Sequence, residues 1–182
     1  MCGVKLKVIE TNLKDCLLIE PQVFEDDRGF FLESFNIKKY ESIGISSVFV
    51  QDNHSSSLRH VLRGLHFQMK KPQGKLVRVV KGEVLDVALD VRPNSPTFRK
   101  WDAVKLSERN KRQFWIPPGF AHGFLVLSEE ADSEYKCTNF YYPDDEMTIR
   151  WNDPSLNIPW GIDNPIISDK DANAPLLSEL SL

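Results

Sequence analysis

The amino-acid sequence predicts an all-β protein, with a few short helices that lie mainly near the carboxyl terminus. The first observation is a period of two over residues 84–91, which is typical of a strand with two unlike faces. One face carries Leu85, Val87, Leu89 and Val91, and the other carries Val84, Asp86, Ala88 and Asp90. The second observation is that short β-rich runs recur between turn residues, a spacing that favours a sandwich or barrel.

The runs that we expect to form strands share β-branched or aromatic residues and end in turn signals. They are residues 16–20, 29–33, 48–51, 63–68, 75–80, 84–91, 114–116, 123–127 and 135–141. Lys81 and Gly82 stand between the runs 75–80 and 84–91, and this pair predicts a hairpin turn.

Helical signals are few. Asn36 can cap a short helix that runs to Tyr40 and ends at Gly44, and residues 171–180 can carry another. A doubly wound α/β fold is therefore disfavoured. The chain also lacks the GxGxxG and GxxxxGK[ST] strings of the common nucleotide sites, so a bound nucleotide would have to be held by side chains.

The bulk composition describes an ordinary globular chain, with one domain expected over residues 1–182. A formal charge of -3 argues against a protein that binds nucleic acid through a basic surface. The chain shows neither the apolar region of a signal peptide nor an apolar run of about 20 residues, so we expect no membrane segment and a cytoplasmic location. Cys2, Cys16 and Cys137 form no CxxC pair, which predicts reduced thiols.

Two histidines stand in settings that could serve chemistry. Residues 63–68 put Gly64, His66 and Gln68 on one strand face, where an imidazole can act as a general base or as a hydrogen-bonded structural group. His122 ends a PxGxxH string that begins at Pro117 and resembles the second motif of the cupin superfamily, whose members are jelly rolls and often bind a metal. Phe67 stands where a second histidine ligand would follow His66, so we expect no metal.

Other polar residues have a functional and a structural interpretation that the sequence leaves open. Residues 51–57 are rich in amides and hydroxyls, and taken alone they read as a solvated loop. Tyr135 can donate a proton or can be a buried structural tyrosine. The basic residues suited to a diphosphate, each of which can equally be a surface residue, are Arg28, Arg63, Lys75 and Arg78.

Taken together, the chain resembles the dTDP-4-dehydrorhamnose 3,5-epimerase family from Ile19 to Asp171. The strings that carry the resemblance are DRGFFLESFN (27–36), FVQDN (49–53), VLRGLHFQ (61–68), PQGKLVRVVKGEVLDVALDVR (72–92), IPPGFAHGFLVLS (116–128), YKCTNFYYPDDE (135–146), IRWNDP (149–154) and ISDKD (167–171). The resemblance implies a homodimeric cupin-type jelly roll that acts, without metal or coenzyme, on a dTDP-linked 4-keto-6-deoxy sugar.

The resemblance also implies roles for individual residues. His66 would be the base and Asp171 would orient it, Tyr135 would return a proton to the opposite face of the sugar, and Lys75 would stabilise the enolate oxygen. The implied substrate contacts are Arg28, Glu33, Gln51, Asn53, Arg63, His122, Glu146 and Lys170, with Asp86 as the partner of His122 and with Phe30 or Phe140 stacking on thymine. Arg63 and His66 are an odd number of residues apart, so either their strand is irregular or Arg63 serves another subunit's site.

Four alternatives stay open. Within the family fold, the chain could epimerise only C3 or could be a 3,4-ketoisomerase; Tyr135 and Lys75 favour double epimerisation. From other classes, it could be a metal-dependent cupin oxygenase or a cupin that only binds a sugar. Metal analysis separates the oxygenase, and hydrogen exchange with solvent separates a catalyst from a binding protein.

Overall fold

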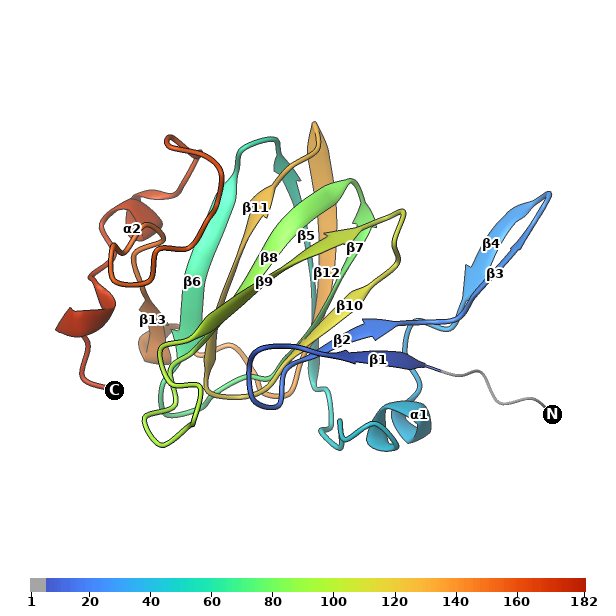
Figure 1. The fold of residues 1–182 in the computed structure, drawn as a ribbon, viewed down its shortest axis with the longest axis horizontal. Coiled ribbons are helices and arrows are strands. Elements are labelled where there is room, and N and C mark those ends of the chain that lie inside the picture. Colours follow the sequence, from blue (N-terminus) through green and yellow to red (C-terminus); the bar gives the residue numbers. More distant parts are fainter. Residues whose placement is uncertain (1–5) are drawn as a thin grey trace.

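A computed structural model describes residues 6–182, which form a jelly roll of two antiparallel sheets. The larger sheet has the order β1-β2-β10-β7-β12-β5 and the smaller has the order β13-β6-β11-β8-β9, as Figure 1 shows. In the larger sheet the strands are β1 (Lys7–Glu10), β2 (Leu17–Glu20), β5 (Gln51–Leu58), β7 (Lys75–Lys81), β10 (Gln113–Ile116) and β12 (Glu130–Cys137). In the smaller sheet they are β6 (Leu62–Gln68), β8 (Glu83–Asp90), β9 (Trp101–Ser107), β11 (Phe120–Val126) and β13 (Glu146–Thr148). The predicted fold class is confirmed.

The main core lies between the two sheets, and the alternation in β8 predicted which side chains enter it. Val84 and Ala88 pack in this core with Val77 and Phe114 of the facing sheet. The other face of β8 packs on the outside of the smaller sheet, in a second cluster that includes Val87 and residues of the C-terminal segment. Asp86 and Asp90 therefore point toward the space between the sheets.

The C-terminal segment covers the outer face of the smaller sheet. Trp160 and Leu177 are buried there against strand residues such as Leu65 and Leu89. The segment carries α2 (Asp169–Ala172) and a 3₁₀ turn at Leu177–Glu179, and it lies beside β6 in Figure 1. The single tail helix expected over 171–180 is thus two short helical pieces, since Pro175 lies between them.

The hairpin predicted at Lys81 and Gly82 is wrong. β7 pairs with β10 and β12, whereas β8 pairs with β9 and β11, so the chain passes from one sheet to the other at Gly82. Gly82 has φ +74°, and a Cβ atom there would lie 2.1 Å from the carbonyl oxygen of Glu130. The same turn residues suit a hairpin and a crossing from one sheet to the other. Only the strands with which β7 and β8 pair distinguish the two arrangements.

The prediction that the polar run 51–57 is a loop is also wrong. These residues belong to β5, which extends over Gln51–Leu58 and pairs with all of β12. The expected strand 135–141 ends early, at Cys137. Strands β1, β9, β13 and β3 (Val23–Asp26) were not expected. The helix after Asn36 is confirmed as α1 (Ile37–Glu41), although the Asn36 side chain makes no capping bond.

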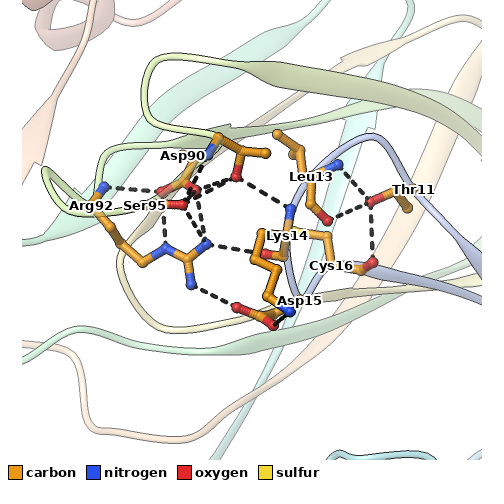
Figure 2. Close-up of polar contacts among 9 residues, drawn as sticks. Thr11, Leu13, Lys14, Asp15, Cys16, Asp90, Arg92 and Ser95 are labelled. Carbon is orange, nitrogen blue, oxygen red and sulfur yellow. Dashed lines mark hydrogen bonds and ion pairs between the residues drawn. The ribbon is translucent and has the colours of Figure 1, made fainter.

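An ionic cluster around the buried Asp90 ties the N-terminal segment to the end of β8 (Figure 2). Asp90 accepts hydrogen bonds from Arg92 (Nε, 2.9 Å) and from the hydroxyl of Thr97 (2.6 Å). Arg92 also donates to the carbonyl of Lys14 (3.0 Å) and to the carboxylate of Asp15 (3.1 Å). With its partners in place, the buried Asp90 can stay charged.

A two-stranded hairpin of β3 and β4 (Gly29–Leu32) projects from the body of the molecule, at the right of Figure 1. Phe24, Phe30 and Phe31 on it are largely exposed. Among residues 6–182, no helix is long and apolar enough to span a membrane. Cys16 and Cys137 are free and buried, and Cys2 lies outside the described residues.

Candidate active site

Two adjoining cavities lie where the sheets and the C-terminal segment meet. The larger has a volume of about 570 Å³ and the smaller about 300 Å³, and both are lined by His66, Lys75 and Tyr135. His66 comes from β6, whereas Lys75 and Tyr135 come from β7 and β12 of the other sheet. The predicted base and the predicted acid therefore face one shared space.

His66 contacts Asp171, which is 105 positions away in the sequence. Its Nε2 lies 2.6 Å from Oδ1 of Asp171, and the other carboxylate oxygen accepts from the backbone N–H of Gly64 (3.3 Å). Asp171 is only 2% exposed. Burial by itself raises the pKa of this carboxyl, but the hydrogen bond and charge of His66 outweigh it and hold the pKa of Asp171 below its ordinary value. Asp171 can therefore stay ionised and orient the imidazole.

The backbone before Asp171 explains how the tail delivers it. Ile166 forms a bridge beside β6, in which its N–H donates to the carbonyl of His60 (2.8 Å) and its carbonyl accepts from the N–H of Leu62 (2.9 Å). Ser168 then caps α2 by accepting from the backbone N–H of Asp171 (3.2 Å). The tail thus folds back over the cavity, as the family resemblance required.

Tyr135 and Lys75 lie on the wall opposite His66. Burial raises the pKa of the Tyr135 phenol, so the phenol stays protonated and can act as an acid. The ammonium of Lys75 lies 5.8 Å from the centroid of the Tyr135 ring. Burial lowers the pKa of Lys75, and the nearby acidic groups Cys137, Asp86 and Glu146 oppose that shift without cancelling it.

His122 and Asp86 form a second buried pair in the larger cavity. Nε2 of His122 lies 2.9 and 3.0 Å from the two carboxylate oxygens of Asp86. His122 is 7% exposed and Asp86 is fully buried. The two side chains meet because β8 and β11 are neighbours in the smaller sheet, and both side chains point toward the space between the sheets. The expected partnership is present.

Arg63 shares the larger cavity with His66, which resolves the question of their spacing in favour of an irregular strand. Opposite β6, the partner of His66 is His122 and the partner of Arg63 is Phe124, so β6 has one extra residue across this step. Such a bulge turns the side chains on either side of it toward the same face. Arg63 donates from Nε to the hydroxyl of Ser57 (3.1 Å).

The expected substrate contacts divide into two groups. Gln51, Asn53 and Glu146 line the smaller cavity, and Lys170 and Arg63 line the larger one. Glu146 contacts both the ammonium of Lys170 and the hydroxyl of Tyr141 (2.9 Å). Burial raises the pKa of Glu146, but these two hydrogen bonds and the charge of His66 outweigh it, so its pKa is lowered overall.

Arg28 and Glu33 do not reach these cavities within one chain. Arg28 lies at the tip of the β3–β4 hairpin, where it pairs with Asp26 (2.6 Å) and its side chain is 90% exposed. Glu33 pairs with Lys39 (2.6 Å) and Asn36. Of the other candidates, Arg78 pairs with Glu134 (2.6 Å) away from both cavities, and the stacking candidates Phe30 and Phe140 are both more than half exposed.

Several lining residues escaped the sequence interpretation. Gln73 and Tyr141 line the smaller cavity, and Ser55 lines the larger one. Ser55 could have been found by recognising 51–58 as a strand, because Gln51, Asn53 and Ser55 then share a face. The apolar wall of the larger cavity includes Val61, Phe124, Ile166 and Ile167, which carry no chemical signal.

No group of three or more His, Cys, Asp or Glu side chains that could hold a metal occurs within residues 6–182. His66 and His122 each bind a different carboxylate, so the two histidines are engaged separately.

The chain is similar along most of its length to known sugar-nucleotide epimerases. The family model described as dTDP-4-dehydrorhamnose 3,5-epimerase matches residues 10–179. A dTDP-4-dehydrorhamnose 3,5-epimerase from Shigella flexneri is 58% identical over 170 residues, covering 92% of this chain and 94% of that protein.

Solved structures agree with this match. The dTDP-6-deoxy-D-glucose-3,5-epimerase of Legionella pneumophila, in complex with dTDP-4-keto-L-rhamnose, has a TM-score of 0.94 at 52% identity, covering 97% of this chain and 95% of that one. ChmJ, a 3'-monoepimerase from Streptomyces bikiniensis in complex with dTDP-quinovose, has a TM-score of 0.87 at 33% identity, covering 92% of this chain and 86% of that one. This chain belongs to the dTDP-4-dehydrorhamnose 3,5-epimerase family.

Proposed function

We propose that this protein is an isomerase that converts dTDP-4-dehydro-6-deoxy-D-glucose to dTDP-4-dehydro-L-rhamnose by inverting C3 and C5, without a cofactor. The observation that carries the proposal is that His66 and Tyr135 come from opposite sheets and face the same cavity. An inverting proton exchange requires such an arrangement, because one group must remove a proton from one face and another must return a proton to the opposite face.

The chemistry follows from the substrate ketone. The C4 carbonyl acidifies the hydrogens at C3 and C5, so His66 can remove either proton and leave an enolate, with the negative charge on the C4 oxygen. The Lys75 ammonium stabilises that oxygen, an effect typically worth a few kcal/mol. Tyr135 then gives its phenolic proton to C5 on the other face, and a water molecule gives a proton to C3. The imidazolium of His66 and the phenolate of Tyr135 return to their starting forms by proton exchange with solvent. Asp171 holds His66 in the orientation that accepts the proton.

For the dTDP part, we assign Gln51, Asn53 and Glu146 to the nucleotide and Arg63 and Lys170 to the diphosphate. A guanidinium and an ammonium on the same cavity suit the charge of a diphosphate. His122, held by Asp86, supports the sugar as a second polar group.

Exchange with solvent tests the reaction. Incubated with the substrate in D2O, the protein is expected to introduce deuterium at both C3 and C5, as measured by mass spectrometry and NMR. His66→Ala should abolish both exchanges, whereas Tyr135→Phe should mainly slow the exchange at C5, by about 10²- to 10⁴-fold for loss of a general acid. Unchanged turnover in His66→Ala would remove this residue as the base.

The second candidate is epimerisation at C3 alone, which the likeness to the 3'-monoepimerase ChmJ supports. ChmJ is less similar to this chain in sequence than the 3,5-epimerase of Legionella pneumophila is. The same experiment separates the two, because deuterium at C3 alone would exclude double epimerisation.

We further propose that the protein is a homodimer and that Arg28 and Glu33 act in the partner's site. The β3–β4 hairpin carries Arg28 out from the body beside exposed aromatic rings at Phe24 and Phe31. Exposed aromatic side chains of this size favour burial against another protein surface. We also retain the cytoplasm as the expected location, which cell fractionation can test.

Subunit mixing tests the shared site. His66→Ala and Arg28→Ala homodimers should each have low activity, and a mixture refolded together should regain activity, since one mixed site then holds neither substitution. Light scattering should give a mass of two chains. A monomer, or a mixture no more active than its components, would contradict the shared site.

A further inference from the structure

Two hydroxyl groups beside the site are buried and unpaired. Ser55 Oγ and Ser133 Oγ have no hydrogen-bond partner among residues 6–182. The two serines face each other directly in the β5–β12 ladder. The other such side-chain atom in the described part of the chain is an oxygen of Asp132, the residue next to Ser133.

The neighbouring polar side chains on the same face of β5 have hydrogen-bond partners, so the serines differ from them in lacking one. Ser57 accepts from Arg63 (3.1 Å), and the Asn53 amide accepts from Gln51 (3.0 Å). A buried hydroxyl without a partner lowers the stability of a fold, so such groups are usually retained where a ligand or water completes them.

The position of the serines suggests which part of a ligand they meet. Ser55 lines the larger cavity together with His66 and Tyr135. Along β5 it lies two residues beyond Asn53, on the same face, and along β12 Ser133 lies two residues before Tyr135. Gln51 lines only the smaller cavity. The serines therefore extend the line of polar side chains on this face of the sheet beyond Tyr135, in the direction away from Gln51.

We propose that Ser55 binds a hydroxyl group of the sugar ring, with Ser133 completing the hydrogen-bonding chain behind it. A sugar hydroxyl is both donor and acceptor, which matches two serine hydroxyls. The apolar side chains of the same cavity, such as Phe124 and Ile167, offer no hydrogen bond. This inference rests on the proposed function, since it assigns the nucleotide to the smaller cavity and both the diphosphate and the sugar to the larger.

The test compares a ligand with the sugar and a ligand without it. dTDP and dTDP-L-rhamnose, which lacks the reactive ketone, are titrated by calorimetry into the parent protein, Ser55→Ala, Ser133→Ala and the control Ser56→Ala, whose side chain is exposed on the other face of β5. We expect Ser55→Ala to lower the affinity for dTDP-L-rhamnose about fivefold to tenfold, as for the loss of one hydrogen bond, and to leave dTDP binding unchanged.

The stability of the ligand-free protein provides a second readout. Alanine removes an unpaired buried hydroxyl, so the Tm of Ser55→Ala and Ser133→Ala should equal or exceed that of the parent. Ser55→Thr keeps the hydroxyl and should bind dTDP-L-rhamnose within about twofold of the parent.

Three outcomes would overturn the inference. Unchanged affinity of Ser55→Ala for dTDP-L-rhamnose would mean that the serines bind water only. An equal loss for dTDP and dTDP-L-rhamnose, or a lower Tm, would indicate a structural role. A parent protein that binds neither compound would contradict both the proposed function and this inference. If the parent turns over the substrate normally but Ser55→Ala binds dTDP-L-rhamnose as tightly as the parent does, only this inference is contradicted.

Discussion

The ammonium of the half-buried Lys75, which we propose as a catalytic group, is expected to change its charge state with pH. Because burial lowers its pKa, it loses its proton at a lower pH than a free lysine, whose pKa is about 10.4. The Tyr135 phenol has a raised pKa and stays protonated over this range. Activity should therefore fall as the pH rises through the lowered pKa of Lys75.

Lys75→Arg tests that assignment. Arginine stays charged to a pH above about 12, so the alkaline fall in kcat/KM should move to higher pH, even though the altered geometry lowers the maximal rate by roughly 10- to 100-fold. The measurement is a pH profile of kcat/KM for both proteins. An alkaline limb at the same pH in both would assign it to another group.

Among the elements, the crossing from β7 to β8 depends most on a single residue. Gly82 connects Lys81, which pairs in the larger sheet, to Glu83, which pairs in the smaller sheet. It adopts a left-handed conformation and lies against the backbone of Glu130. Any other residue at this position would strain the backbone, and its Cβ atom would clash with the carbonyl oxygen of Glu130.

Gly161 provides a matched control for that crossing, because it has nearly the same φ (+75°) but open space where a Cβ would lie. Gly161→Ala should cost about 1–2 kcal/mol from backbone strain alone. Gly82→Ala should cost more than about 3 kcal/mol, because the clash adds an overpacking penalty. Urea unfolding of both variants measures the difference, and equal costs would show that the corner relaxes freely.

At the scale of the whole molecule, the C-terminal segment both completes a core and supplies Asp171. Leu177 is 2% exposed in the cluster that covers the smaller sheet, and its backbone N–H donates to Asp153 (2.7 Å). Leu177→Ala should lower the free energy of unfolding by about 2–5 kcal/mol. Leu58→Ala, at a side chain that is 67% exposed, should change it by less than about 0.5 kcal/mol. If thermal unfolding showed the two variants to be alike, the segment would not be part of the cooperative core.

The sequence by itself determined the features that depend on local periodicity. The alternation in 84–91 assigned each side chain of β8 to its face, and the same rule placed His66 opposite Leu65 and Phe67. Family resemblance added the jelly roll and linked His66 to Asp171, a contact that no local pattern contains.

Only the tertiary structure decided what depends on pairing partners. Turn residues at Gly82 allow a hairpin or a corner, and a polar run such as 51–58 becomes a strand only because β12 supplies its hydrogen bonds. The bulge that turns Arg63 toward His66 arises from the register with β11. These features are set by contacts between residues far apart in the sequence, so a reading of neighbouring residues could not determine them.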